Sequence, residues 1–192
     1  MDSKIKLSIL IASIPERAKR LQDVMALYEY YIEKYQLEGV QILSIVDNKK
    51  STIGAKRYDL IYIALGEFIV MVDDDDELTE TYFKEIFNYI NGDYDVVTYK
   101  QLARLDKNYS FVHFGLRRPN DDLVPSGITI RMAWTCCTWR KSIVDQIKFG
   151  DTNWGEDSEW AAAANKVAKN EHHINEICHI YQHDSETTAA FQ

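Results

Sequence analysis

Short apolar runs alternate with longer amphipathic segments in the first hundred residues, and this alternation is what most constrains the fold. The runs are rich in β-branched residues and stop at turn-forming or acidic residues, which is typical of buried strands. The segments between them repeat apolar residues at helical spacing. Such an order predicts a parallel sheet with helices on both faces. We predict strands over Lys4–Ser13, Val40–Val46, Phe68–Val72 and Tyr94–Tyr99, and helices over Pro15–Tyr35, Gly54–Leu65 and Leu78–Ile90.

The second half of the chain follows a less regular pattern. No repeat or linker separates it from the first half, and 192 residues suit one α/β domain. We predict short strands and loops over Leu102–Asp122, a strand-like segment over Ile128–Trp139, a helix over Glu156–Lys169 and a final strand over Ile174–His183.

Charge and cysteine content narrow the class of protein. The formal net charge is −8, and a field of this sign does not attract nucleic acid or anionic membrane, although it leaves room for a local basic patch. The three cysteines, two of them adjacent, predict reduced thiols rather than disulfides or a structural zinc site. No apolar stretch approaches the roughly 20 residues that span a bilayer. We therefore expect a soluble cytoplasmic protein with no membrane partner.

Four adjacent aspartates, Asp73–Asp76, directly follow a predicted buried strand. Neighbouring carboxylates repel one another, and a divalent cation relieves that repulsion because hard cations take oxygen ligands. Alternate residues of an extended segment point the same way, so Asp73 and Asp75 are expected to share one metal ion or one ligand. The alternative is a solvated acidic turn in which Asp76 or Thr79 caps the next helix. The position at the end of a buried strand favours the metal.

A second acidic pair, Glu156 and Asp157, follows Gly155 at the start of a predicted helix. A positioned carboxylate can act as a general base that removes a proton from a hydroxyl group. Helix N-termini also stabilise carboxylates through the helix dipole, so simple capping is the alternative.

Further polar residues are expected at the carboxyl ends of the strands, where ligands of open α/β sheets bind. Ser13 and Asp47 end two of the predicted strands beside the acidic run. Lys56 and Arg57 open a helix near the same edge, and cations at a helix N-terminus favour phosphate. Their spacing matches neither a Walker loop nor a Rossmann glycine fingerprint, so alone this is a weak signal.

Taken together and in order, these motifs resemble the inverting glycosyltransferases of family 2. The matching segments are Ser13-Ile14-Pro15-Glu16-Arg17, Val46-Asp47-Asn48, Gly54-Ala55-Lys56-Arg57, the stretch from Ala64 to Asp76, and Trp154-Gly155-Glu156-Asp157. The resemblance covers most of the chain. It implies a GT-A fold, which is a Rossmann-like mixed sheet flanked by helices. It also implies that residues 1–100 bind the nucleotide-sugar and residues 101–192 bind the acceptor.

The resemblance further implies roles for single residues. Asp73 and Asp75 would hold Mn²⁺ or Mg²⁺ on the donor diphosphate, and His183 lies where many such enzymes place a metal-binding histidine. Most of the other C-terminal histidines are expected at ordinary surface or strand positions. Asp157 would be the base and Glu156 would orient the acceptor, in one displacement that inverts the anomeric carbon. The implied donor-binding residues are Ser13, Ile14, Pro15, Arg17, Asp47, Lys56, Arg57, Asp73 and Asp74.

The family suggests a UDP-sugar as donor and leaves the acceptor open. The processive Arg/Gln-x-x-Arg-Trp motif is absent, which favours transfer of a single sugar. Compact members of this kind also resemble bacteriophage enzymes, some of which glycosylate modified bases in DNA. Arg117-Arg118 and Lys49-Lys50 would then form a basic track, or else they are solvated surface charges. A glycan, a protein or a small molecule is an equally good acceptor.

Two other functions use similar features. A nucleotidyltransferase also binds a nucleotide and a metal on an α/β sheet, but it normally carries a glycine-rich loop after the first strand, and the loop Ser13–Arg17 has no glycine. A sugar-nucleotide-binding module without catalysis would keep the fold and the donor site. The acidic residues Asp73–Asp76 and Asp157 favour an enzyme.

Overall fold

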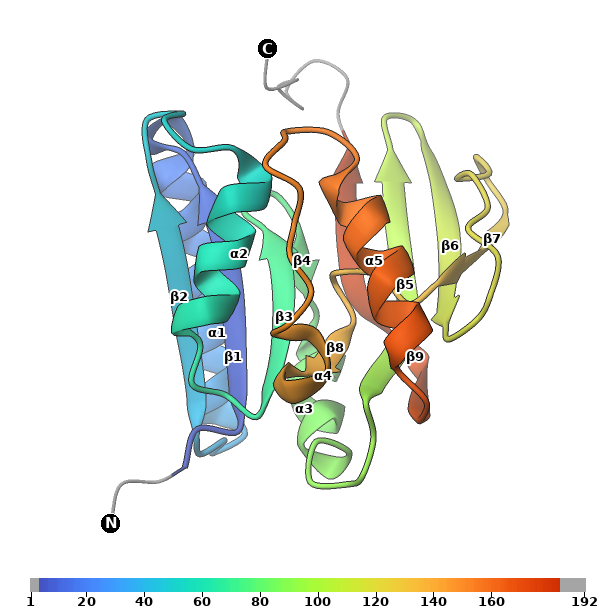
Figure 1. The fold of residues 1–192 in the computed structure, drawn as a ribbon, viewed down its shortest axis with the longest axis horizontal. Helices are drawn as coiled ribbons and strands as arrows, with labels where there is room; N and C mark the ends of the chain where they lie inside the picture. Colours follow the sequence, from blue (N-terminus) through green and yellow to red (C-terminus); the bar gives the residue numbers. More distant parts are fainter. Residues whose placement is uncertain (1–3, 184–192) are drawn as a thin grey trace.

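The computed structural model describes residues 4–183, which form a sheet covered by helices on both faces (Figure 1). The strands are β1 (Leu7–Ser13), β2 (Val40–Val46), β3 (Phe68–Asp73), β4 (Glu77–Leu78), β5 (Val96–Leu105), β6 (Asn108–Gly115), β7 (Ile128–Met132), β8 (Thr138–Arg140) and β9 (Glu171–His183). The helices are α1 (Ala18–Lys34), α2 (Ile53–Ile63), α3 (Glu80–Glu85), α4 (Lys141–Val144) and α5 (Glu156–Val167), with 3-10 turns at Pro15–Arg17 and Ile86–Asn88. No helix in this part of the chain is long and apolar enough to cross a membrane.

The sheet runs in the order β2-β1-β3-β8-β5-β6-β7, and β9 pairs with both β5 and β4. β1 lies in parallel register between β2 and β3, which confirms the alternation expected for the first half. Both faces of β1 are buried because alternate residues pack on different helices. Leu7, Ile9 and Ile11 join the cluster that contains residues of α1 and α3, whereas Leu10 and Ala12 join the cluster of α2 and α5.

The sheet is mixed, as expected for a GT-A fold, and the parallel arrangement predicted from the first half holds for the neighbours β2, β1 and β3. β8 runs antiparallel between β3 and β5, so these two parallel strands do not touch. The segment Ile128–Trp139, expected as one strand, is divided into β7 and β8 by a turn. The carbonyl of Trp134 holds this turn, since it accepts bonds from the Cys137 amide at 3.0 Å and from Trp139 Nε1 at 2.8 Å.

One strand and one helix, β5 and α3, differ in length from their predictions. β5 extends to Leu105, and the parallel pairing of β5 with β9 crosses the predicted boundary between residues 1–100 and 101–192. The helix expected over Leu78–Ile90 is shorter, because Leu78 belongs to β4 and pairs with β9. Thr79 is the N-cap of α3 and accepts a bond from the Tyr82 amide.

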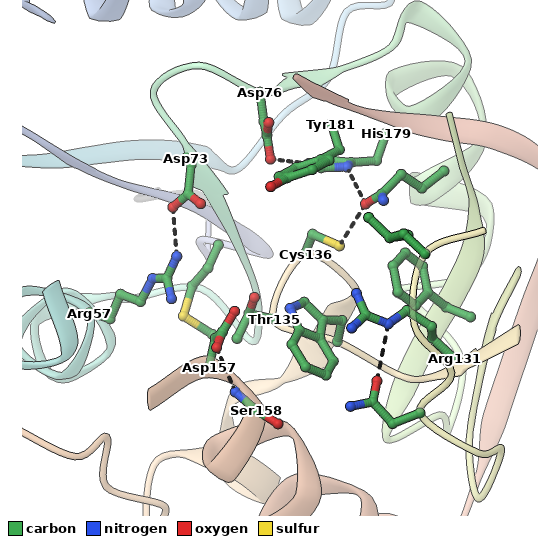
Figure 2. Close-up of a pocket in the computed structure, with 16 residues that line it drawn as sticks. Arg57, Asp73, Asp76, Arg131, Thr135, Cys136, Asp157, Ser158, His179 and Tyr181 are labelled. Carbon is green, nitrogen blue, oxygen red and sulfur yellow. Dashed lines mark hydrogen bonds and ion pairs between the residues drawn. The ribbon is translucent and has the colours of Figure 1, made fainter. Parts of the chain in front are cut away.

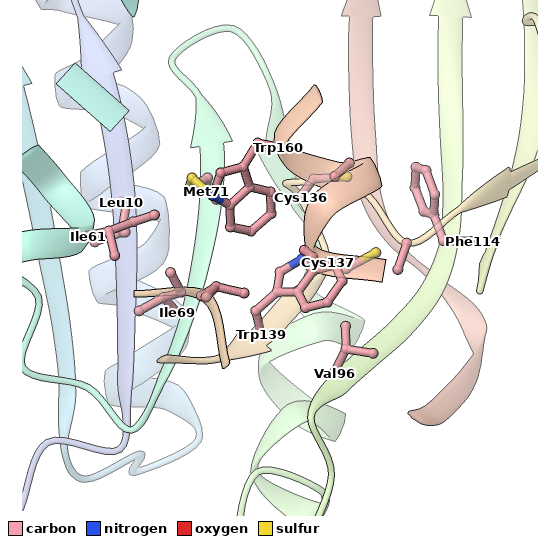
Figure 3. Packing of buried hydrophobic residues seen from close by; sticks show 14 of the residues in the cluster. Leu10, Ile61, Ile69, Met71, Val96, Phe114, Cys136, Cys137, Trp139 and Trp160 are labelled. Carbon is pink, nitrogen blue, oxygen red and sulfur yellow. The ribbon is translucent and has the colours of Figure 1, made fainter. Parts of the chain in front are cut away.

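An aromatic cluster fixes the start of α5 against the sheet (Figure 3). The ring of Trp160 on α5 packs edge-on against Trp139 at a centroid distance of 5.6 Å and stacks on Phe149 at 5.1 Å. All three rings are buried, and Cys136 and Cys137 fill the same core as free thiols. Because buried aromatic packing tolerates little displacement, the first turn of α5 has a fixed position.

A glycine at the start of α2 lets this helix approach the loop before α5. A Cβ atom on Gly54 would lie 1.9 Å from the Gly150 carbonyl oxygen, and the Gly54 amide donates to the Thr152 carbonyl at 3.2 Å. We expect Gly54→Ala to lower the free energy of unfolding by about 1–3 kcal/mol, because backbone atoms must move. Urea unfolding measures this. Gly150→Ala is the control, since its Cβ would meet nothing nearer than 3.7 Å, and equal stability of both variants would contradict the close approach.

Candidate active site

The site lies at one edge of the sheet, where the carboxyl ends of β1, β2 and β3 meet the N-termini of α2 and α5 (Figure 1). Arg57 on α2 joins the two acidic motifs at this edge. Its Nη2 lies 2.6 Å from Asp73 Oδ1, and its Nη1 lies 2.7 Å from Glu156 Oε1. Arg57 is only 6% exposed. Burial acts to lower the pKa of the guanidinium, but the two carboxylates raise it above its ordinary value, so Arg57 stays cationic.

Glu156 and Asp157 are neighbours with different surroundings. Glu156 is buried and points to Arg57, and burial raises the pKa of Glu156 even though Arg57 opposes the shift. Asp157 instead lines a cavity, and its Oδ1 accepts a bond from the Ser158 amide at 2.7 Å (Figure 2). Of the two carboxylates, Asp157 is the one that a ligand in the cavity can reach.

A second ion pair closes the edge at β1 and β2. Lys56 is buried, and its Nζ lies 2.8 Å from Asp47 Oδ1 and donates to the Ser13 carbonyl at 3.0 Å. The other oxygen of Asp47 accepts a bond from the Ser51 amide at 2.7 Å. The hydrogen bond from Lys56 lowers the pKa of Asp47 below its ordinary value, although burial of Asp47 acts to raise it. Lys56 therefore links the expected donor-binding residues Ser13 and Asp47.

The acidic run forms a turn rather than the extended segment that we expected. The Asp76 amide donates to the Asp73 carbonyl at 3.0 Å, which closes the turn. Asp74 is 2% exposed and Asp76 is 5% exposed, so the alternative of a solvated acidic turn is wrong for both. Asp73 and Asp75 are the more exposed members, and their sharing of one metal ion stays a prediction.

The buried member Asp74 ties this turn to the loop after β1. Its Oδ2 accepts a bond from Ser13 Oγ at 2.5 Å, and its Oδ1 lies 2.7 Å from Arg17 Nη1. The same Arg17 nitrogen lies 3.2 Å from Asp75 Oδ2. Ile14 is buried behind this contact, and Pro15 begins the 3-10 turn that carries Arg17. The loop after β1 is thus held against the acidic turn by charge and by packing.

In the described part of the chain, Asp75 has only one nearby ion-pair partner, Arg17, which it shares with Asp74. Burial and the nearby charge of Asp73 raise its pKa, and Arg17 only partly opposes them. Among the described residues no group of three or more His, Cys, Asp or Glu side chains is placed to hold a metal ion. His183 ends β9, and its ring stacks on Tyr181 at 6.4 Å. A metal at this turn would therefore rest on one or two aspartates and on oxygen atoms of a ligand.

The histidine that faces the acidic turn is His179, which we had not singled out from the sequence. It is 1% exposed, with Nε2 lying 3.4 Å from Asp76 Oδ2 and Nδ1 lying 2.9 Å from Gln101 Oε1. Burial lowers the pKa of His179 to about 4, so the ring is neutral at pH 7. The pairing of β4 with β9 brings it there, because Leu78 lies opposite His179.

These residues surround a cavity of about 320 Å³ (Figure 2). The acidic turn, α2 and α5 form one end, and β7 with the turn after it forms the other. Its lining residues are Arg57, Met71, Asp73, Asp76, Gln101, Phe114, Asn120, Leu123, Arg131, Trp134, Thr135, Cys136, Asp157, Ser158, His179 and Tyr181. The lining residues between Phe114 and Thr135 were not identified from the sequence, which carries no motif there.

The two basic pairs do not form one track. Lys49-Lys50 follows the carboxyl end of β2, at the edge that carries the site. Arg117-Arg118 follows β6, which runs antiparallel to β5 and so ends at the opposite edge of the sheet. This geometry favours the alternative of two separate groups of surface charges.

Solved structures of other proteins share this fold. The crystal structure of S. aureus TarS superposes with a TM-score of 0.64 at 14% identity, covering 93% of this chain and 37% of that chain. TarS 1-349 in complex with UDP-GlcNAc gives a TM-score of 0.64 at 13% identity, covering 94% and 59%. A197 from STIV gives 0.53 at 15% identity, covering 88% and 82%. The chain thus spans less than two thirds of the TarS chains, and the likeness shows the expected GT-A fold.

Sequence comparison identifies the family. Among curated proteins no match was found. The family described as Glycosyl transferase family 2 matches residues 28–148, which is more than half of the chain and includes α2, β3 and the acidic turn. The match ends before Glu156 and Asp157, which the structure itself brings to the same cavity through Arg57. By fold and by sequence, the chain belongs to glycosyl transferase family 2.

Proposed function

We propose that this protein is a glycosyltransferase that moves one sugar from a nucleotide-sugar, a UDP-sugar, to an acceptor hydroxyl group with inversion. The observation that carries the proposal is the Arg57 bridge, which holds Asp73 and Glu156 together and so places the acidic turn and Asp157 at one cavity. Transfer needs both a site for the leaving diphosphate and a base for the acceptor. Membership of family 2 supports the reaction, and the TarS complex with UDP-GlcNAc on the same fold supports the donor class.

The donor nucleoside would lie over the edge formed by Ser13, Asp47 and Lys56, beside the loop Ile14–Arg17. These groups are held in place by the contacts of Lys56 with the other two, so the surface that they offer is fixed before a ligand binds. A rigid site loses less conformational entropy on binding. In this assignment Arg57 acts on the donor indirectly, by orienting Asp73.

The acidic turn fits a divalent cation supplied together with the donor. Asp75, assisted by Asp73, would hold Mn²⁺ or Mg²⁺, and His183 stays a predicted third ligand from the sequence. Mg²⁺ is commonly bound by one or two carboxylates together with substrate phosphates, which agrees with the small set of carboxylates here. When bound, the ion would stabilise negative charge on the leaving diphosphate.

On the acceptor side, Asp157 would accept the proton of the attacking hydroxyl group. It is the cavity-facing member of its pair, whereas Glu156 is turned inward to Arg57. Glu156 would thus position the first turn of α5 and the acceptor indirectly. Transfer in a single displacement requires that base and leaving group lie on opposite sides of the sugar, so the sugar would sit between Asp157 and the diphosphate held at the acidic turn.

Nucleoside diphosphate release from UDP-, GDP- and dTDP-sugars tests the proposal. With Mn²⁺ we expect slow hydrolysis of one donor and its loss in EDTA, and we expect Asp75→Ala to weaken donor binding by calorimetry at least about tenfold. Asp23→Ala, an exposed aspartate on α1, is the control.

Binding and turnover that persist in EDTA would contradict the metal assignment alone. Absence of both turnover and binding with every donor would contradict the function. Release of pyrophosphate in place of a nucleoside diphosphate would favour a nucleotidyltransferase.

A further inference from the structure

Two arginines line the cavity, and their surroundings differ. Figure 2 shows Arg57 beside Asp73 at one end and Arg131 at the other, with Thr135 between them. Arg57 is paired with two carboxylates at 2.6 and 2.7 Å. Arg131, on β7, forms no ion pair with any residue in the described range 4–183.

The guanidinium of Arg131 is nevertheless held in a defined plane. Its central carbon lies 4.6 Å from the centroid of the Trp134 ring, and its Nε donates to Asn120 Oδ1 at 3.1 Å. Stacking and one hydrogen bond orient the group while its two Nη nitrogens stay available. Asp121 and Asp122 lie next to Asn120 in the chain, yet neither carboxylate is within ion-pair distance of Arg131.

Arg131 differs from the arginines at the acidic turn. Those are paired with acidic partners: Arg17 with Asp74 at 2.7 Å and Arg57 with Asp73 at 2.6 Å. An oriented guanidinium that faces a cavity without a carboxylate matches the geometry of an incoming carboxylate or phosphate, because it offers parallel N–H donors. The missing anion is therefore expected on a ligand.

The position of Arg131 assigns that ligand to the acceptor. β7 is the last strand of the sheet path, whereas the proposed donor edge is formed by β2, β1 and β3 at the other end. Asp157, the proposed base, lines the same cavity, at the end formed by the acidic turn, α2 and α5. We propose that Arg131, Trp134 and Asn120, the Arg131 subsite, bind a phosphate or carboxylate group carried by the acceptor. This inference rests on the proposed function, because only group transfer gives the cavity an acceptor.

The test uses the full chain and the indole N–H resonances of its four tryptophans, with Trp134 assigned by Trp134→Phe. Glucose 6-phosphate, glucuronate and glucose are titrated separately, with and without UDP and Mg²⁺. We expect at least one anionic probe to shift the Trp134 signal and glucose to leave it unchanged. Arg131→Gln should weaken that binding about tenfold or more, since a charge-assisted hydrogen bond is lost. Arg104→Gln, which removes the same charge from an exposed position on β5, should bind as wild type.

Each outcome decides a separate point. Binding of neither anion at Trp134, or equal affinity in Arg131→Gln and wild type, would overturn the subsite. A stronger effect of one anionic probe identifies the anion as phosphate or carboxylate. Anion binding that depends on Arg131 in a protein that neither binds UDP nor turns over any donor would keep the subsite and reject the proposed function.

Discussion

Asp157→Asn is expected to lower the rate of sugar transfer by about 10²–10⁴-fold, the usual contribution of a general base, while donor affinity stays unchanged. The amide has nearly the same shape as the carboxylate and can still accept the bond from the Ser158 amide. The side chain loses its negative charge and with it the capacity to take up a proton. Asp157 is not among the proposed donor-binding residues, so calorimetry with the donor should give the wild-type dissociation constant.

Glu159→Gln is the matched control for this change. Glu159 stands in the same first turn of α5, is exposed and does not line the cavity. Both substitutions remove one negative charge from the helix N-terminus, so both lose the same favourable interaction with the helix dipole. Equal rates for Asp157→Asn and Glu159→Gln would show that Asp157 acts only as a capping charge, and the base would have to be sought elsewhere in the cavity.

The first half of the fold could be predicted because its signals are local. In β1 every residue is buried, and the apolar run stops where the strand stops. The turn within Ile128–Trp139 could not be predicted in this way, since the run stays apolar through it. What divides the run is the Trp134 carbonyl, which accepts bonds from two later residues, and the insertion of β8 between β3 and β5 depends on that turn.

The sequence predicted which residues form the candidate site better than it predicted which residues they contact. Asp73, Asp75 and Asp157 were named from the order of their segments along the chain, and the structure places Asp73 and Asp157 at one cavity. Arg57, expected to meet a phosphate, instead contacts residues 16 and 99 positions away in the chain, and such distant pairing leaves no local pattern. The sequence could not single out Arg131 either. Its distinguishing feature is that no carboxylate among the described residues lies within ion-pair distance, and this depends on the folded structure.

Arg57→Met is expected to lower the free energy of unfolding by about 3–5 kcal/mol, because it leaves Asp73 and Glu156 charged without their shared partner. Native domains are stable by about 5–15 kcal/mol, so this is a large part of the total. Arg57→Lys should recover only part of the loss, since one ammonium group cannot reproduce two separate guanidinium contacts. Lys19→Met, which breaks the exposed pair with Asp23, should change stability by less than about 1 kcal/mol.

The pH dependence of urea unfolding separates charge from packing in Arg57→Met. Burial acts to raise the pKa of Asp73, but Arg57 holds it below its ordinary value of 3.8. The wild type therefore gains stability from this ion pair above that pH and loses it as the pH falls through the lowered pKa. The Arg57→Met variant lacks this stabilising ion pair. At low pH, protonation of Asp73 and Glu156 removes the cost of burying their unpaired negative charges. The difference between the two proteins should therefore be largest near neutral pH and shrink below about pH 4. A difference that stays constant with pH would instead assign the loss to the contact of Arg57 with the Phe149 ring at 6.0 Å.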